Sequence, residues 1–239
     1  MIARMSKDLP RYARTGLAAL ISSTLAVAAA QAATVNWTDW TSKTSNTVSG
    51  SVIADSTSIG VTYGGVQYSF AQINGVGTDF WSPTTPYLSP TVSNSPTPVD
   101  IVALSAAGTS TITFSQAVVN PLIALVSWNG AKVTFGGGAD SQTYNIQYLS
   151  SGHGYWGTGS FGSPTSNSFT GVGELHGVIE LVGTYKTISF TDTTPEGWHG
   201  LTVGFESVAA VPEPSVAWLM LAGLPLMAFI ARRRGRAAE

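Results

Sequence analysis

The sequence predicts an all-β fold, an antiparallel β-sandwich or jelly roll that occupies residues 33–210. Three observations favour this fold class. Apolar and polar residues alternate in several short runs, which is typical of half-buried strands. Glycine, proline and asparagine turn signals separate these runs. Only 10% of the residues are charged, against about 25% in an average soluble protein, and no internal stretch shows a helical period with caps.

The expected strands follow from the alternation. The apolar positions of five alternating runs are Val66, Tyr68 and Phe70; Ile112 and Phe114; Tyr144, Ile146 and Tyr148; Ile188 and Phe190; and Leu201, Val203 and Phe205. The apolar run 122–128 predicts a central strand that is buried on both faces. Asn129-Gly130 lies between this run and residues 133–135, and such a pair favours a hairpin that joins two strands.

Two segments do not fit a strand pattern. Residues 82–98 contain five prolines, which cannot pair within a central strand. We expect a long ordered loop or crossing connection there, inside one domain. Residues 152–168 are rich in glycine and serine and predict a second irregular stretch.

The chain has no cysteine, so disulfides and thiolate chemistry are excluded. A domain of this length can be stable without disulfides.

The charge distribution excludes one class of partner. Residues 34–210 contain three lysines and no arginine against ten acidic residues, a net charge of −7. A nucleic-acid-binding surface needs positive charge to neutralise phosphates. We therefore expect no nucleic-acid partner.

The N-terminal residues 1–32 have the three parts of a secretory signal peptide. Four basic residues lie within the first 14 positions, the apolar run 16–30 follows, and Ala30-Gln31-Ala32 forms a small-x-small cleavage site. This pattern predicts export by the general secretion translocase and cleavage by signal peptidase. The alternative is an uncleaved membrane anchor, but the apolar run is short for a membrane span.

The C-terminal residues 211–239 also have three parts. Residues 211–215 (VPEPS) form a stiff, extended spacer, because proline restricts itself and its neighbour. Residues 216–231 are uncharged and predict one transmembrane helix of roughly 24 Å. Residues 232–239 are rich in arginine, which places this tail in the cytoplasm and the β domain in the periplasm.

The motif Pro212-Glu213-Pro214, followed by a short apolar helix and a terminal arginine cluster, resembles the PEP-CTERM sorting segment. The resemblance covers residues 211–239. It implies an exosortase, a membrane peptidase that would act on this motif, and a host that produces exopolysaccharide and biofilm. It also implies an inner-membrane anchor followed by transfer to the cell surface or extracellular matrix. The alternative is a plain single-span anchor.

A second, weaker resemblance covers residues 100–205. It rests on residues 111–121, 154–156, 174–179 and 196–204. The series is similar to an ectodomain that recurs on PEP-CTERM proteins. That group implies an exported surface protein and no defined activity.

Aromatic residues in irregular segments are the candidate binding residues. Tyr155, Trp156 and Trp198 are the ones selected, and Trp81 and Tyr87 are of the same kind. A flat aromatic ring offers an apolar platform to the face of a sugar. The alternative is that these rings fill the ends of the hydrophobic core, because Trp is highly buried on average.

Histidines and acids offer a rival, enzymatic hypothesis. His153, His176 and His199 each precede a glycine and could form a three-His metal site, or each could bond a neighbouring acid or turn. Glu174 would share a strand face with His176, and Glu196 could reach His199. No motif selects a carboxylate pair for glycan hydrolysis, so we predict no catalytic residue and no metal ligand. A structural calcium near Asp79 or Asp192 stays open.

The sequence thus predicts an exported, exosortase-processed envelope or matrix protein without enzymatic activity, with glycan binding as the hypothesis for its task. Two alternatives remain. One is a metal-dependent or glycan-active enzyme that uses the His and Glu residues of 174–199. The other is an inert structural module that self-associates through its sheet edges.

Overall fold

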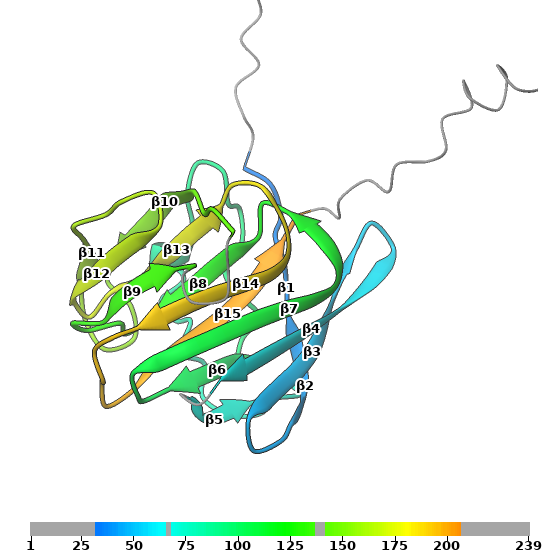
Figure 1. The fold of residues 1–239 in the computed structure, drawn as a ribbon, viewed down its shortest axis with the longest axis horizontal. Helices are drawn as coiled ribbons and strands as arrows, with labels where there is room; N and C mark the ends of the chain where they lie inside the picture. Colours follow the sequence, from blue (N-terminus) through cyan, green and yellow to red (C-terminus); the bar gives the residue numbers. More distant parts are fainter. Residues whose placement is uncertain (1–31, 66–67, 137–141, 207–239) are drawn as a thin grey trace, which may run out of the picture. The chain divides into compact units, whose positions relative to one another are not determined.

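The computed structural model describes residues 32–65, 68–136 and 142–206, which form two antiparallel β-sheets (Figure 1). The all-β prediction is confirmed for this part of the chain. The signal peptide, the sorting motif and the expected transmembrane helix lie outside the described residues. No helix within the described residues has the length and apolarity needed to cross a membrane.

The larger sheet has eight strands. Their order is β11 (Gly159–Gly162), β12 (Ser168–Gly173), β9 (Lys132–Phe135), β14 (Thr184–Asp192), β7 (Gly108–Val119), β4 (Thr57–Gly65), β3 (Thr47–Ala54) and β2 (Asp39–Lys43). Every neighbouring pair is antiparallel, and the ladder of β14 with β7 runs from Thr184 opposite Val119 to Asp192 opposite Gly108, with a register shift after Tyr185.

The second sheet has seven strands. Their order is β10 (Ile146–Gly152), β13 (His176–Leu181), β8 (Leu122–Val126), β15 (His199–Phe205), β6 (Ile101–Leu104) and β5 (Tyr68–Gln72), with β1 (Asn36–Trp37) paired to the end of β15. A short 3-10 helix, η1 (Thr85–Tyr87), lies in the loop between β5 and β6.

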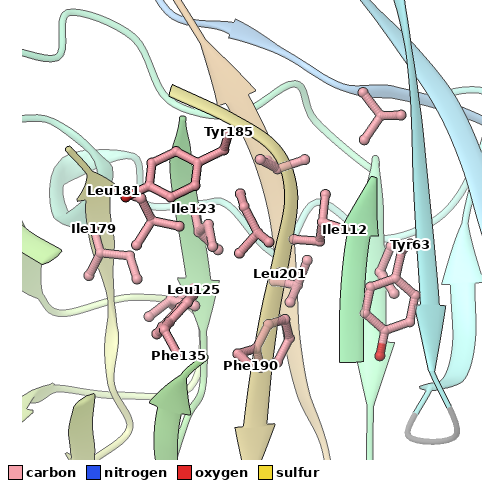
Figure 2. Close-up of a cluster of buried hydrophobic side chains, with 14 of the residues drawn as sticks. Tyr63, Ile112, Ile123, Leu125, Phe135, Ile179, Leu181, Tyr185, Phe190 and Leu201 are labelled. Atoms are coloured by element: carbon pink, nitrogen blue, oxygen red, sulfur yellow. The ribbon is translucent and has the colours of Figure 1, made fainter. Parts of the chain in front are cut away.

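The main core lies between the two sheets and contains side chains from both. Ile112 and Phe190 come from the eight-stranded sheet, and Leu125 and Leu201 come from the seven-stranded sheet (Figure 2). The alternation predicted for β7 and β14 is confirmed, since their apolar positions are buried between more exposed threonines and serines. Full burial of one such side chain stabilises the fold by about 1.5–3 kcal/mol.

The inner strands β8, β13, β15 and β6 of the seven-stranded sheet are buried on both faces, as predicted for β8. The half-buried pattern expected of β15 is wrong, because all seven of its residues are buried. A second apolar cluster covers the outer face of this sheet. Its members are Val35, Trp37, Trp81, Tyr87, Val92, Ile101, Leu122, Ala124, Val126 and Val178.

The proline-rich segment 82–98 provides part of this cover, and the expectation of a long ordered connection is confirmed. Tyr87 is fully buried in η1, and its hydroxyl lies 3.2 Å from Nδ1 of His176 on β13. Trp81 packs edge-on against Tyr87 and donates from Nε1 to the carbonyl of Asp100. Trp81 and Tyr87 therefore fill the core, as one alternative for the loop aromatics foresaw.

The hairpin predicted at Asn129-Gly130 is wrong. β8 belongs to the seven-stranded sheet and β9 to the eight-stranded sheet, so the chain crosses between the sheets at this point. Trp128 anchors the crossing, because its indole Nε1 donates to the carbonyl of Gly200 over 2.7 Å and its backbone N–H donates to Leu175. Tertiary contacts therefore override the local hairpin preference of the pair.

The expectation of irregular structure throughout 152–168 is also wrong in part. β11 forms inside this segment and pairs with β12, with Phe161 opposite Gly171. Phe161 packs edge-on against Tyr148 and Phe169. These contacts supply the apolar burial that a short glycine-rich strand needs, and the local sequence does not reveal them.

Candidate functional site

The structure brings Tyr155, Trp156 and Trp198 together with Phe80 in one aromatic cluster. Ring centroids are 4.5 Å apart for Trp156 and Trp198, 4.7 Å for Tyr155 and Trp156, and 5.1 Å for Phe80 and Trp156. Tyr155 is 43% exposed and Trp156 46% exposed, so the cluster presents ring surface to solvent. Three of its members were predicted from the sequence, and Phe80 was not.

Three separate segments supply these rings. Phe80 precedes the proline-rich loop, Tyr155 and Trp156 lie between β10 and β11, and Trp198 directly precedes β15. The turn that carries Tyr155 and Trp156 is closed by a hydrogen bond from the N–H of Gly154 to the carbonyl of Gly157, 2.7 Å long. A Cβ at position 154 would lie 2.2 Å from the ring of His176, so only glycine lets the turn sit this close to β13.

A pocket of about 310 Å³ adjoins the cluster and is lined by Ser127, Trp156, Glu174 and Trp198. Both oxygens of the Glu174 carboxylate accept hydrogen bonds. The hydroxyl of Ser127 donates to Oε2, and Nδ2 of Asn129 donates to Oε1 over 3.0 Å. No lysine of the described ranges forms an ion pair with Glu174, so its charge faces the pocket without a cationic partner from this part of the chain.

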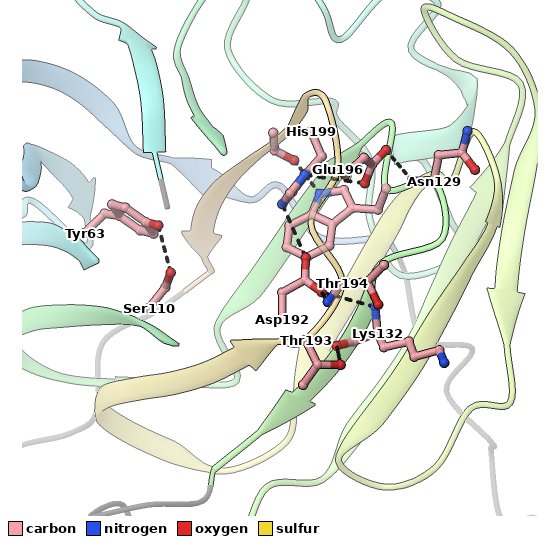
Figure 3. A network of polar contacts seen from close by, with 11 residues as sticks. Tyr63, Ser110, Asn129, Lys132, Asp192, Thr193, Thr194, Glu196 and His199 are labelled. Carbon is pink, nitrogen blue, oxygen red and sulfur yellow. Dashed lines mark hydrogen bonds and ion pairs between the residues drawn. The ribbon is translucent and has the colours of Figure 1, made fainter. Parts of the chain in front are cut away.

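Asn129 holds a second carboxylate as well. Its backbone N–H donates to Oε1 of Glu196 over 2.7 Å (Figure 3). Its side-chain Nδ2 donates to Glu174. The sequence predicts a hairpin at Asn129 and assigns no functional role to Ser127. The only signal for either residue is that both flank Trp128, whose anchoring role appears in the folded chain.

The imidazole of His199, the residue after the pocket-lining Trp198, is fully buried. Its Nδ1 is 3.4 Å from Oε2 of Glu196, its Nε2 is 3.7 Å from Oδ2 of Asp192, and its ring packs edge-on against Trp128 (Figure 3). The expected reach of Glu196 to His199 is therefore present. Burial lowers the pKa of His199 to about 4, so the ring is neutral at neutral pH.

Burial raises the pKa of Glu196 to about 8, although the hydrogen bond from Asn129 opposes the shift, and the nearby Glu174 and Asp192 carboxylates raise it further. Burial also raises the pKa of Asp192. The contact between Glu196 and His199 is therefore one between two neutral groups near neutral pH rather than a charged ion pair.

The free energy of unfolding is expected to fall as the pH rises from about 6.5 to 8.5. Native Glu196 keeps its proton up to a pKa of about 8, whereas its ordinary value is 4.5. The folded state therefore binds more protons than the unfolded state in this window, and stability falls with pH. His199 opposes this fall only weakly above its ordinary value of 6.5, because the native ring is already neutral and the unfolded ring is half neutral at that pH and loses its remaining charge as the pH rises. Partial solvent screening limits the loss to about 1–2 kcal/mol, measurable by urea unfolding.

Two variants show whether Glu196 causes this pH dependence. Glu196→Gln keeps the oxygen that accepts from Asn129 and removes the titration, so the slope above pH 6.5 should flatten. Asp55→Asn alters an exposed acid in the β3–β4 turn and should keep the slope of the unchanged protein. An unchanged slope in Glu196→Gln would assign the effect to another group.

The remaining histidines do not join this site. The predicted strand pair of Glu174 and His176 is wrong, because β13 begins at His176 and Glu174 bonds Ser127 and Asn129 instead. His153 lies 3.1 Å from the hydroxyl of Thr158 across a turn. Within the described ranges, no group of three or more His, Asp or Glu side chains is placed to hold a metal ion, and the three-His hypothesis finds no support there.

The two acids named for a structural calcium have other partners. Oδ1 of Asp79 accepts from the backbone N–H of Trp81, and Oδ1 of Asp192 accepts from the N–H groups of Lys132 and Thr194. These hydrogen bonds stabilise turns.

Scans of the chain against protein-family models, curated proteins and solved structures found no significant match in any of the three.

Proposed function

We propose that this protein binds glycans through the pocket and the aromatic cluster beside it. The observation that carries the proposal is a pair of indole rings in the pocket wall. Trp156 and Trp198 both line the pocket, and their ring centroids are 4.5 Å apart. An indole face matches the apolar face of a sugar ring, and Ser127 and Glu174 offer hydrogen-bonding groups to its hydroxyls.

The cluster is also pre-organised. Trp156 stacks on Phe80 with an angle of 26° between the rings, and Phe80 contacts Trp198 at 4.8 Å. Side chains that are already held in place lose little conformational entropy when a ligand binds. An exposed aromatic surface supported in this way is better suited to binding than a single flexible tryptophan.

The place of action in this proposal follows from the sequence of the two ends. The domain would be exported with a signal peptide (1–32), held by a transmembrane helix (216–231), and processed by an exosortase at Pro212-Glu213-Pro214. It would act as a non-enzymatic component of the cell envelope or extracellular matrix, with exopolysaccharide as its partner. The two sheets would then form a β-sandwich or jelly roll displayed outside the cell.

Trp156→Ala should weaken glycan binding at least about 10-fold, because the platform loses its most exposed ring. The purified full chain would be titrated by calorimetry with cello-, chito- and chitosan oligosaccharides. Ile53→Ala is the control, since Ile53 is 69% exposed on β3, away from the pocket-lining segments. Absence of binding to every oligosaccharide would contradict the proposal and favour an inert, self-associating module.

A second candidate function is glycan hydrolysis, and one observation favours it. Asn129 holds a carboxyl group that keeps its proton at neutral pH, Glu196, near a pocket-lining carboxylate, Glu174. An acid that protonates the leaving oxygen and a base that takes a proton from the attacking water would together add water across a glycosidic bond. New reducing ends formed by the full chain, and lost in Glu196→Gln, would support this function over simple binding.

A further inference from the structure

We infer that the ligand of this pocket carries a positive charge, as a sugar with a free amino group does. The inference rests on the proposed function and names its ligand class: an amino sugar that has lost its acetyl group, within an oligosaccharide. Its basis is the juxtaposition of two indole rings with the Glu174 carboxylate in one pocket.

The Glu174 carboxylate is the reason to expect a positive charge on the ligand. Glu174 accepts hydrogen bonds from Ser127 and Asn129, and these neutral donors leave its negative charge uncompensated. Both bonds also fix the orientation of the carboxylate, so a ligand would meet a preformed acceptor. An ammonium group would supply donors and the missing charge together, whereas a uronate or phosphate group would be repelled.

The aromatic rings favour the same ligand. The electron-rich face of an indole attracts an ammonium group, and tryptophan is the best of the aromatic side chains in this role. Trp156 and Trp198 meet at 66°, so their rings face the pocket region in different directions. The apolar body of the sugar would lie against one ring while its ammonium group approaches the other ring and Glu174.

The surroundings reinforce the preference. Residues 34–210 carry a formal net charge of −7, and the acid that lines the pocket is Glu174. A field of this sign raises the local concentration of cationic ligands and disfavours anionic ones.

The test compares two oligosaccharides of the same length that differ in whether their amino groups are acetylated, and therefore in charge. The purified full chain is titrated at pH 6 with a chitosan hexamer, which bears free amino groups, and with the fully N-acetylated chitin hexamer. We expect the amino form to bind at least about 10-fold more tightly. Equal affinities, or a preference for the acetylated form, would overturn the inference and leave the proposed glycan binding intact. Absence of binding to either hexamer would contradict the proposed function and the inference together.

Glu174→Gln separates a local effect from a general one. Glutamine keeps an oxygen that accepts from Asn129 and removes the charge, so the preference for the amino hexamer should fall to within about twofold while binding of the acetylated hexamer persists. Asp55→Asn removes the same unit of charge from an exposed turn and should keep the preference. An equal loss of preference in the two variants would show that net charge alone attracts the amine, and the inference would be wrong.

Discussion

Trp128→Ala is expected to lower the free energy of unfolding by about 3–5 kcal/mol, which is a large part of the 5–15 kcal/mol that holds a typical domain together. The indole is fully buried and packs against Phe169, Phe190 and His199. Its loss leaves a cavity between the sheets, and the carbonyl of Gly200 loses the donor that satisfies it.

Trp156→Ala is the matched control for this measurement, because it removes the same side chain from a site that is 46% exposed. Its effect on stability should stay below about 1 kcal/mol. Urea unfolding followed by far-UV circular dichroism measures both variants without dependence on tryptophan fluorescence. Similar losses for the two would contradict the anchoring role of Trp128.

Gly171→Ala is expected to destabilise the fold by about 3 kcal/mol or more, although it adds a single methyl group. A Cβ at this position in β12 would lie 1.7 Å from the carbonyl oxygen of Trp128. Strand β12 cannot move aside freely, because two hydrogen bonds hold Gly171 against the crossing segment. The N–H of Gly171 donates to the carbonyl of Ala131, and the carbonyl of Gly171 accepts from the N–H of Gly130. The crossing segment between β8 and β9 must therefore shift.

Gly64→Ala provides the comparison, because a Cβ on this glycine of β4 meets no atom within 4 Å. We expect a change within about 1 kcal/mol, with a gain from reduced freedom of the unfolded chain. Thermal unfolding of the two variants under one buffer condition is sufficient. A Gly171→Ala protein as stable as Gly64→Ala would mean that β12 does not approach the crossing segment as closely as the structure has it.

Both destabilising changes act on the segment that carries the candidate site. Ser127 and Asn129 flank Trp128, and each donates a hydrogen bond to Glu174. Loosening the crossing segment would therefore release the carboxylate as well as weaken the core. We expect the folded fraction of the Trp128→Ala and Gly171→Ala proteins to bind glycan less tightly than the unchanged protein does. Calorimetry under native conditions would measure this difference.

The candidate site was predictable in part. Large aromatic rings in irregular segments predict the binding residues Tyr155, Trp156 and Trp198. The structure brings these three rings together in one cluster. The same reasoning also admitted Trp81 and Tyr87, which are buried. Composition does not distinguish these outcomes, because exposure depends on what the proline-rich loop covers.

The polar half of the site could not be predicted. Ser127, Asn129 and Glu174 come from two segments 45 residues or more apart, and each has an ordinary local explanation as a strand, turn or loop residue. Their convergence depends on the crossing between sheets, which replaces the hairpin that Asn129-Gly130 favours. A local turn preference is worth little against the burial of an entire indole.

The sequence by itself determined the all-β class, the inward residues of β7 and β14, the double burial of β8 and the ordered proline-rich connection, because strand periodicity and proline geometry are local properties. Tertiary structure alone decided which sheet receives each strand, why β15 is buried on both faces, and which aromatic rings stay exposed. Those outcomes depend on contacts between distant segments, such as Trp128 with Gly200 and Tyr87 with His176, and no local pattern encodes the partner of a side chain.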